Sequence, residues 1–292
     1  MKKLKQVIDQ IKNLPAENTD ELEQLLWPYL CYSPKLPLRL GQQQLLQDAE
    51  TATLKVHDEF FAGRELAFNA FRWGNGTFKI LLTHGWGSKA ADFNELISAL
   101  STFEDLSIIA FDAPGTGSSE GDFSNLLLFK LAVQAVGKQY GNPDLWIGHS
   151  LGAMANVFAQ RDMEVRPSLL ISITPLVRLQ ENFQASMDAL NISSANQATF
   201  FESFQEKFRV SASSFTLDHL YDFNDQLNHW LAFDSSDDIA PYPYLQEFLA
   251  HHPTIRETDY KDVGHSKAMK SPEIIADILA KVESILKYRT MN

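Results

Sequence analysis

The residue whose setting most directly suggests chemistry is a serine between two glycines. Ser150 stands in the segment Gly148-His149-Ser150-Leu151-Gly152, directly after a short apolar run and directly before a helical pattern. A turn this tight holds its central residue in a strained conformation, and side chains at the two glycine positions would collide with the flanking strand and helix. Because such strain exposes the hydroxyl, we predict that Ser150 is a nucleophile.

A serine hydroxyl is a poor nucleophile at neutral pH unless a base takes its proton, and histidine has a suitable pKa. His265 lies in a loop between a predicted strand and the last predicted helix, where it can reach over the edge of a sheet. We predict that His265 is the general base, that His149 packs away from the serine hydroxyl, and that His84 holds its own loop by hydrogen bonds. The other histidines lie in helical or polar stretches and are expected at the surface: His57, His219, His229, His251 and His252.

The imidazole needs a carboxylate that holds its tautomer and stabilises the cation formed during proton transfer. The loop after the penultimate predicted strand carries three aspartates, Asp234, Asp237 and Asp238. Asp237 is the prediction for this role, with Asp234 and Asp238 as the alternatives. An acidic loop of this kind can also be a solvated turn.

Two backbone N–H groups are expected to stabilise the negative charge that develops on a carbonyl oxygen. Leu151 begins the helix that follows the serine, so its N–H is free to point toward that oxygen. The second donor is predicted in the loop His84-Gly85-Trp86-Gly87, and we assign it to the N–H of Trp86. The same loop is also compatible with a glycine-rich turn and a packed tryptophan.

These residues require a scaffold, and the chain from about residue 55 onward indicates one. Short apolar runs alternate with longer helical patterns, which is typical of strands joined by crossover helices in a mostly parallel sheet. Residues 66–73 and 79–83 are predicted as strands that pair in a hairpin across the turn at 74–76. Further strands are predicted at 106–111, 145–148, 169–173, 230–233 and 255–260.

The strand pattern is interrupted once, between about residues 178 and 228, where aromatic residues recur at helical spacings. We predict a helical lid at 178–228, a core formed by 51–177 and 229–292, and an N-terminal extension at 1–50. The extension should contain two helices and a proline-containing link. A single domain with one insertion is the simplest reading of 292 residues.

Composition narrows the function classes. The net charge of -12, with no cluster of basic residues, argues against a nucleic-acid partner. With Cys31 as the single cysteine, the chain offers no internal disulfide and no cysteine-based zinc site. No segment has the roughly 20 apolar residues of a membrane span, and the lysine-rich N-terminus reads as an amphipathic helix, so a cytoplasmic location is expected. No cluster indicates a metal or an organic cofactor, and the oligomeric state is not indicated.

Taken together, the motifs resemble those of the α/β-hydrolase superfamily. They are the segments at 84–87, 111–119 and 148–152, Asp237 with Pro241, and Gly264-His265. The resemblance covers about residue 55 to the C-terminus and implies an eight-stranded, mostly parallel sheet with a lid inserted after the sixth strand. The chain order serine, aspartate, histidine agrees with it. Relatives such as epoxide hydrolases and haloalkane dehalogenases carry aspartate at the nucleophile position, which Ser150 argues against.

The function expected from these residues is hydrolysis of a carboxylic ester of a small, apolar acyl group through an acyl-enzyme. Thioesters, lactones and amides are variants of the same chemistry. The alternatives are a binding or regulatory protein that keeps the fold without turnover, or acyl-transfer or lyase chemistry. A dinucleotide-dependent oxidoreductase is disfavoured because the third glycine after Gly115 and Gly117 falls at Gly121, one residue late.

Overall fold

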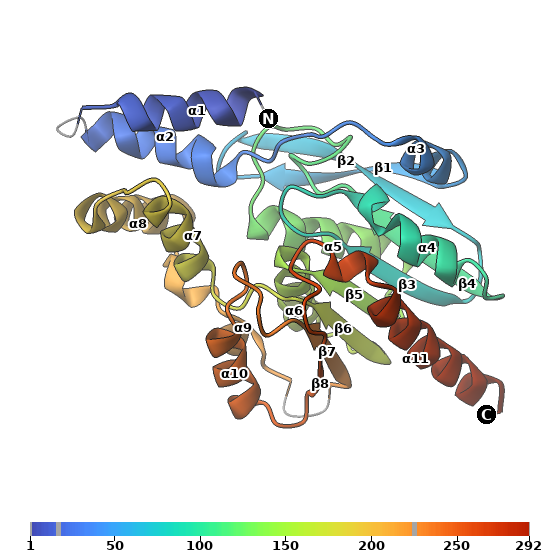
Figure 1. Cartoon of the computed structure of the whole chain (residues 1–292). Coiled ribbons are helices and arrows are strands. Elements are labelled where there is room, and N and C mark those ends of the chain that lie inside the picture. Colours follow the sequence, from blue (N-terminus) through green and yellow to red (C-terminus); the bar gives the residue numbers. More distant parts are fainter. Residues whose placement is uncertain (1, 16–18, 224–226, 292) are drawn as a thin grey trace.

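The computed structural model describes residues 2–15, 19–223 and 227–291 and contains an eight-stranded sheet in the order β1-β2-β4-β3-β5-β6-β7-β8. Strand β2 runs antiparallel to β1 and β4, whereas the strands from β4 to β8 in this order are parallel. The predicted eight-stranded, mostly parallel sheet is therefore confirmed (Figure 1). The strands are β1 (Glu50–Asp58), β2 (Arg64–Trp73), β3 (Phe78–Thr83), β4 (Leu106–Phe111), β5 (Leu145–His149), β6 (Leu169–Ile173), β7 (His229–Phe233) and β8 (Arg256–Asp259).

Helices cover both faces of the sheet, because successive side chains of a strand point to opposite faces. In β3, Leu81 packs with α5 and α6 on one face, whereas Ile80 and Leu82 pack with α3, α4 and α11 on the other. None of the helices in the described ranges combines the length and apolar character needed to cross a bilayer. The flanking helices are α3 (Leu40–Gln47), α4 (Asn94–Leu100), α5 (Leu126–Tyr140), α6 (Leu151–Met163), α10 (Tyr242–His251) and α11 (Pro272–Met291).

Strands β2 and β3 follow each other in sequence but are not neighbours in the sheet, so the predicted hairpin is wrong. Strand β4 lies between them, antiparallel to β2 and parallel to β3. The turn at 74–76 does form, but Gly76 N donates to the carbonyl oxygen of Leu106, at the start of β4, at 3.1 Å. A turn signal predicts that the chain reverses, whereas the crossover that follows decides which strand becomes the partner.

The N-terminal 50 residues contain three helices in their described part, one more than predicted. α1 (Lys2–Asn13) and α2 (Thr19–Cys31) form an adjacent pair, and the link after α2 leads into the short helix α3. The buried residues of α3 are only Gln42 and Leu45, and the Gln42 amide donates to Asp92 Oδ1 at 2.8 Å. This helix is held by a polar contact with a distant residue, so no apolar periodicity marks it in the sequence.

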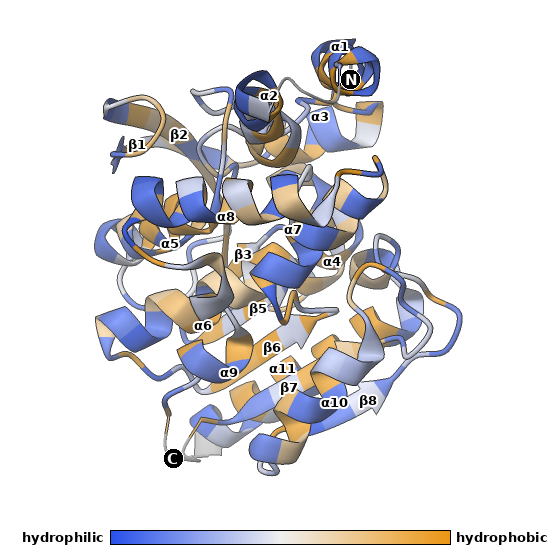
Figure 2. Ribbon diagram, turned by 90° about the vertical axis from the view of Figure 1, so that its left-hand side faces the viewer, coloured by the Kyte–Doolittle hydropathy of each residue, from blue (hydrophilic) through white to orange (hydrophobic). Residues whose placement is uncertain are grey.

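The helical insertion after β6 is also confirmed. It consists of α7 (Leu179–Asp188), α8 (Ser194–Phe208) and α9 (Leu217–Leu220), with a 3-10 turn at Ala212–Ser214; residues 224–226 of the predicted segment lie outside the described residues. Both views place α8 beside α2 of the N-terminal extension, and Figure 2 shows the hydrophobic strands β5 and β6 below the mixed surfaces of α7 and α8.

Aromatic stacking joins α2 to α8. The Trp27 ring lies 4.8 Å from the ring of Phe200 and 6.1 Å from the rings of Phe204 and Phe208, measured between centroids. Two hydrogen bonds add to the contact of α2 with the insertion. Ser203 Oγ of α8 donates to Glu23 Oε1 at 2.6 Å, and Tyr29 OH donates to the Ser186 carbonyl of α7 at 2.7 Å. The N-terminal extension therefore holds the insertion in place, although more than 150 residues separate α2 from α8 in sequence.

We predict that Trp27→Ala lowers the free energy of unfolding by about 3 kcal/mol, because the change removes a large ring from an aromatic cluster. Urea unfolding followed by circular dichroism measures the loss. Trp27→Phe is the matched control, and we expect it to retain most of the stability because a ring remains. A Trp27→Ala protein as stable as wild type would show that α2 does not support the insertion.

Candidate active site

The backbone of Ser150 has the strained conformation that the sequence predicts. Its φ of 52° and ψ of -120° lie in a region that residues with side chains rarely adopt. A Cβ on Gly148 would lie 2.5 Å from Ala153 Cα, and one on Gly152 would lie 2.3 Å from Thr83 O. Both glycines are therefore required by close backbone approaches.

The predicted residues come together because each follows the carboxyl end of a parallel strand. Trp86 follows β3, Ser150 follows β5, Asp237 follows β7 and His265 follows β8. The carboxyl ends of parallel strands share one edge of the sheet, where open α/β sheets bind ligands. The neighbouring Leu151 is the first residue of α6, so its N–H has no carbonyl partner within that helix.

Ser150, His265 and Asp237 form one hydrogen-bonded chain. His265 Nε2 lies 2.9 Å from Ser150 Oγ, and His265 Nδ1 lies 2.7 Å from Asp237 Oδ2. Because a carboxylate only accepts, Nδ1 carries the proton and Nε2 is left to accept the serine proton. The side chains of His265 and Asp237 are 9% and 2% exposed, so little water competes for these bonds.

The environment of Asp237 keeps it ionised. Burial alone raises the pKa of its carboxyl, but the hydrogen bond from His265 and the N–H groups of Ala240 and Ile239 outweigh burial and lower the pKa below its usual value. Ile239 N and Ala240 N donate to Asp237 Oδ1 at 2.8 and 3.1 Å, leaving Oδ2 to the histidine. An ionised carboxylate here can stabilise a histidine cation.

The two alternative aspartates have other contacts. Asp234 Oδ2 accepts from Gly264 N at 2.7 Å, and Asp234 Oδ1 accepts from the backbone and hydroxyl of Ser236. This carboxylate therefore ties the loop after β7 to the residue before His265 without touching the imidazole. Asp238 lines a cavity that opens beside Ser150 and His265. The geometry thus favours Asp237 over both alternatives as the partner of His265.

His149 and His84 are both buried beside this chain of residues. His149 Nε2 donates to the His265 carbonyl oxygen at 3.0 Å, and burial, with the nearby His265, lowers the pKa of His149 to about 4. His84 Nε2 accepts from Ala113 N at 3.1 Å, and burial lowers its pKa. His84 thus holds two loops together, and His149 holds the backbone of His265.

His229 is not at the surface, so that prediction is wrong. It begins β7, is 1% exposed, and its Nε2 lies 2.9 Å from Ser172 Oγ of the adjacent strand β6. Burial lowers the pKa of His229 to about 3. Polar residues precede His229 in the sequence, so its position was predicted to be solvated. In the structure His229 is the first residue of β7, a strand that is buried on both faces.

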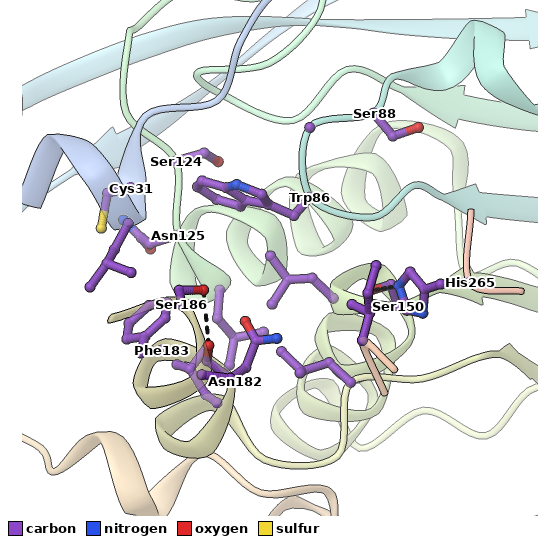
Figure 3. A pocket seen from close by; sticks show the side chains of 18 of the residues that line it. Cys31, Trp86, Ser88, Ser124, Asn125, Ser150, Asn182, Phe183, Ser186 and His265 are labelled. Atoms are coloured by element: carbon purple, nitrogen blue, oxygen red, sulfur yellow. Dashed lines mark hydrogen bonds between the residues drawn. The ribbon is translucent and has the colours of Figure 1, made fainter. Parts of the chain in front are cut away.

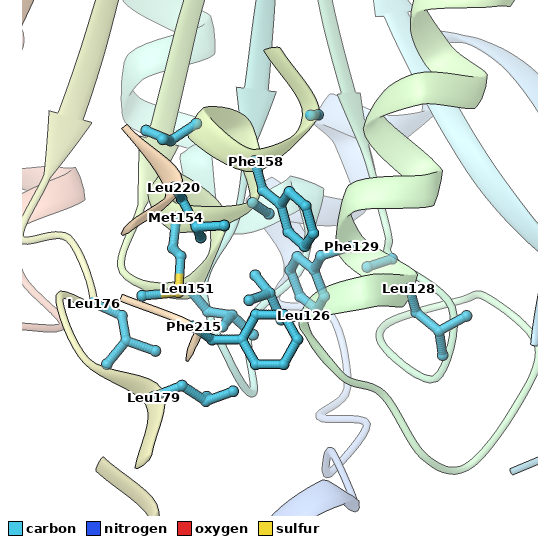
Figure 4. Packing of buried hydrophobic residues seen from close by; sticks show 14 of the residues in the cluster. Leu126, Leu128, Phe129, Leu151, Met154, Phe158, Leu176, Leu179, Phe215 and Leu220 are labelled. Atoms are coloured by element: carbon cyan, nitrogen blue, oxygen red, sulfur yellow. The ribbon is translucent and has the colours of Figure 1, made fainter. Parts of the chain in front are cut away.

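A cavity of about 710 Å³ opens beside Ser150 and His265 (Figure 3). Such a volume is typical of pockets for small organic ligands. Its wall is formed by the loops that carry Trp86, Asp238 and His265 and by helices α2, α7 and α8. Figure 4 shows Leu126, Leu151, Leu179 and Phe215 within the apolar packing behind this wall. Its apolar lining includes Leu30, Leu126, Leu151, Leu176, Leu179, Phe183, Phe204, Phe208 and Phe215.

The sequence did not reveal that α2 forms part of this wall. Tyr29, Leu30 and Cys31 line the cavity from α2, and Ser124 and Asn125 line it from the loop before α5. These positions depend on how distant segments pack, and no local motif marks them. In the described ranges no group of three or more histidine, cysteine or acidic side chains is arranged to hold a metal ion.

The loop after β3 passes directly over the serine. A Cβ on Gly85 would lie 3.0 Å from Ser150 Cβ and 2.8 Å from His149 Nδ1, so only glycine allows this approach. Trp86 follows in the same loop, is 37% exposed and lines the cavity. The N–H groups of Trp86 and Leu151 belong to the two segments that flank Ser150.

We predict that the low pKa of His149 makes stability depend on pH. The unfolded chain takes up this proton near pH 6.5, whereas the folded protein takes it up near pH 4. The stabilising contribution is therefore present above pH 6.5 and is lost as the pH falls toward 4. Between pH 7 and 5, His149 should lower the free energy of unfolding by about 2 kcal/mol, which urea unfolding at both pH values measures.

His149→Gln is the matched control, because a glutamine amide can donate to the His265 carbonyl without titrating. Over the same pH interval, its free energy of unfolding should fall by about 2 kcal/mol less than that of wild type. Equal pH dependence of the two proteins would contradict the prediction.

Comparison with known proteins finds solved structures with a similar fold and one relative whose sequence matches part of this chain. The chain is 28% identical over 110 residues to the pimeloyl-[acyl-carrier protein] methyl ester esterase of Proteus mirabilis (strain HI4320), a match that covers 37% of this chain and 41% of that enzyme. The chain thus spans about two fifths of the length of this curated relative.

Solved structures match over most of the chain. The esterase Pf2001 of Pyrococcus furiosus superposes with a TM-score of 0.62 at 16% identity, covering 89% of this chain and 97% of the esterase. Mouse alpha/beta hydrolase domain-containing protein 10 gives a TM-score of 0.60 at 16% identity, and the match covers 82% of this chain and 99% of the mouse protein. At these identities the likeness shows the fold alone. The model of the alpha/beta hydrolase family matches residues 80–278, more than half of the chain. The chain therefore belongs to the alpha/beta hydrolase family.

Proposed function

We propose that this protein is a serine esterase that cleaves carboxylic esters of small, largely apolar acyl groups through an acyl-enzyme. The observation that carries the proposal is the hydrogen-bonded chain from Asp237 through His265 to Ser150, beside a cavity. A hydroxyl bonded to a histidine, which is in turn bonded to a carboxylate, is the arrangement that activates serine in acyl transfer. The esterase names of the Proteus mirabilis relative and the Pyrococcus furiosus structure support the choice of an ester.

In the proposed mechanism, Ser150 Oγ attacks the ester carbonyl while His265 Nε2 takes the hydroxyl proton. Asp237 stabilises the histidine cation through Nδ1–H. The oxygen of the tetrahedral intermediate accepts hydrogen bonds from the N–H groups of Leu151 and Trp86. Collapse of the intermediate expels the alcohol, which receives the proton from His265. Water, activated by the same histidine, then releases the acid and restores Ser150.

The cavity supports an apolar substrate. Leucine and phenylalanine side chains form much of its lining, and apolar surface of this kind favours acyl or aromatic groups over strongly polar ones. Phe204, Phe208 and Phe215 belong to the insertion at 178–228 and reach the cavity. We therefore propose that the insertion acts as the lid of the site and limits the length of the substrate.

The proposed roles predict the effect of three substitutions. Ser150→Ala should lower kcat/KM for p-nitrophenyl butyrate by at least about 10⁴-fold and abolish labelling by a fluorophosphonate probe, because the nucleophile is lost. His265→Ala should have a similar effect. Asp237→Asn should lower kcat by about 10³-fold or more, because an asparagine favours the wrong imidazole tautomer. Initial rates measure the loss of turnover, and gel fluorescence of the same samples measures the labelling by the probe.

Asp234→Asn is the matched control, because Asp234 does not contact the imidazole. The amide oxygen can accept from Gly264 N, while the bond from Ser236 N to the second oxygen is lost. We expect its kcat to stay within about tenfold of wild type. If Asp234→Asn were the more damaging change, the acid would be misassigned. If folded wild-type protein neither reacted with the probe nor hydrolysed any ester, the proposed esterase function would be wrong.

A further inference from the structure

The lining of the cavity is divided by charge. Its acidic and basic side chains, the histidines aside, are Asp92, Asp238 and Lys270, which follow strands β3, β7 and β8. Within the described residues, helices α2, α5, α7 and α8 contribute apolar and neutral polar side chains to the lining but no charged one. The cavity therefore has a charged end, formed by the segments that follow the strands, and a largely apolar end formed by the helices.

The proposed reaction determines which part of an ester meets each end. His265 Nε2 hands its proton to the alcohol oxygen, so the alcohol part must lie beside the segment that carries His265. Ser266 and Lys270 follow His265 closely in the chain and also line the cavity. The acyl part extends from the other side of the carbonyl carbon. Figure 3 shows Ser88 and His265 on one side of the view and Phe183 on the other. The alcohol part therefore meets the charged end, and the acyl part meets the apolar end.

Lys270 supplies donors to the charged end that no described residue uses. Burial alone would raise the pKa of Asp92, but hydrogen bonds from Ser88 and Gln42 and the charges of nearby lysines outweigh burial and lower it. Asp92 Oδ2 accepts from Ser88 Oγ at 2.8 Å, and Asp92 Oδ1 lies 3.6 Å from Lys89 Nζ, so this carboxylate has a cation of its own. Among the described residues, Lys270 Nζ makes neither a hydrogen bond nor an ion pair.

The backbone of Lys270 is held at the cavity wall by its neighbours. It ends the 3-10 turn Ala268–Lys270, in which Ala268 and Met269 are 1% and 4% exposed. Lys270 N donates to the Lys267 carbonyl oxygen at 2.9 Å and closes the turn. The lysine side chain therefore starts from a fixed point, and only its flexible stem and amino group adapt to a ligand.

The presence of both signs of charge at this end favours a neutral polar group. An anionic alcohol would face Asp92 and Asp238 in a protein of net charge -12, and a cationic alcohol would face Lys270. A hydroxyl can accept from an ammonium group and also donate to a carboxylate. An alcohol with several hydroxyls therefore matches this end of the cavity better than an ion of either sign or an alkyl group.

We propose that the alcohol part of the substrate is a neutral polyol and that Lys270 binds one of its hydroxyl oxygens. The substrate class is then a monoester that joins an apolar acid to a polyhydroxy alcohol such as glycerol or a sugar. This inference rests on the proposed esterase function and assigns the leaving-group specificity of the same site.

The test compares two esters that differ only in the hydroxyls of the alcohol. Glycerol 1-monobutyrate and propyl butyrate share the acyl group and a three-carbon alcohol, and both release butyric acid, which a pH-stat measures. The readout is the ratio of kcat/KM for the glycerol ester to kcat/KM for the propyl ester, which should exceed one for wild type. Lys270→Met should lower kcat/KM for the glycerol ester by about three- to tenfold, the effect of losing one hydrogen bond, and leave that for the propyl ester unchanged.

Lys267→Met is the matched control, because it removes the same charge from an exposed lysine three residues earlier that does not line the cavity. It should leave the ratio unchanged. Lys270→Arg keeps a charged donor and should retain most of the preference for the glycerol ester. If Lys270→Met keeps the wild-type ratio, or if wild type does not prefer the glycerol ester, Lys270 binds no hydroxyl of the alcohol and the inference is wrong.

Two charged esters test the neutrality of the alcohol. O-butyrylglycolate carries an anion on the alcohol part, and butyrylcholine carries a cation. Wild type should have a lower kcat/KM for both than for glycerol monobutyrate, because each ion meets a like charge in the lining. A preference for O-butyrylglycolate that Lys270→Met removes would assign Lys270 to an anionic alcohol and overturn the polyol class.

A binding measurement separates this inference from the esterase proposal. Titration calorimetry of Ser150→Ala protein with glycerol monobutyrate and propyl butyrate compares the two ligands without turnover. Adding Lys270→Met to that protein should weaken binding of the glycerol ester about three- to tenfold and leave that of the propyl ester unchanged. Absence of this difference, in a protein whose wild type hydrolyses p-nitrophenyl butyrate, overturns the polyol site alone. The difference in binding without any esterase activity overturns the reaction and retains the site.

Discussion

The strained backbone of Ser150 is the constraint that the rest of the site depends on. Its positive φ of 52° costs about 1 to 3 kcal/mol and persists only if the surroundings hold it. They do so through Ser150 N, which donates to Ile173 O at 3.0 Å, and through Ser150 O, which accepts from Leu176 N at 3.1 Å. The ends of β5 and β6 and the start of α6 are thereby fixed relative to one another. Gly85 then allows the loop after β3 to approach the same residue.

A second dependence joins segments that are far apart in the chain. The cavity beside Ser150 is closed by α2 from the N-terminal extension and by α7 and α8 from the insertion. Neither segment buries its aromatic side chains alone, because Trp27 of α2 packs against Phe200 and Phe204 of α8 as well as against Phe61. The shape of the cavity is therefore a property of this contact. The extension completes the site, rather than being an appendage to the hydrolase core.

Local signals account for what could be predicted. Ser150, His265 and Asp237 stand in short motifs after apolar strands, and their positions at the strand ends follow from the parallel sheet. The position of β4 between β2 and β3 could not be predicted, because pairing is decided by crossovers rather than by adjacent sequence. The burial of His229 and the contribution of α2 to the cavity likewise depend on contacts between distant residues. Hydrophobic periodicity records which side of an element is buried, but not what covers it.

The charges around the imidazole of His265 explain why this histidine, rather than His149, suits the proposed role of base. His149 packs with its ring centroid 5.0 Å from that of His265, and a proton on both would place two cations in a buried site. Because burial and the neighbouring His265 keep the pKa of His149 at about 4, it stays neutral while His265 gains a proton. Its Nε2–H still donates to the His265 carbonyl, so it supports the base without competing for Asp237. Burial thus separates the roles of two otherwise identical side chains: one positions the backbone, and the other, held by a carboxylate, can carry charge.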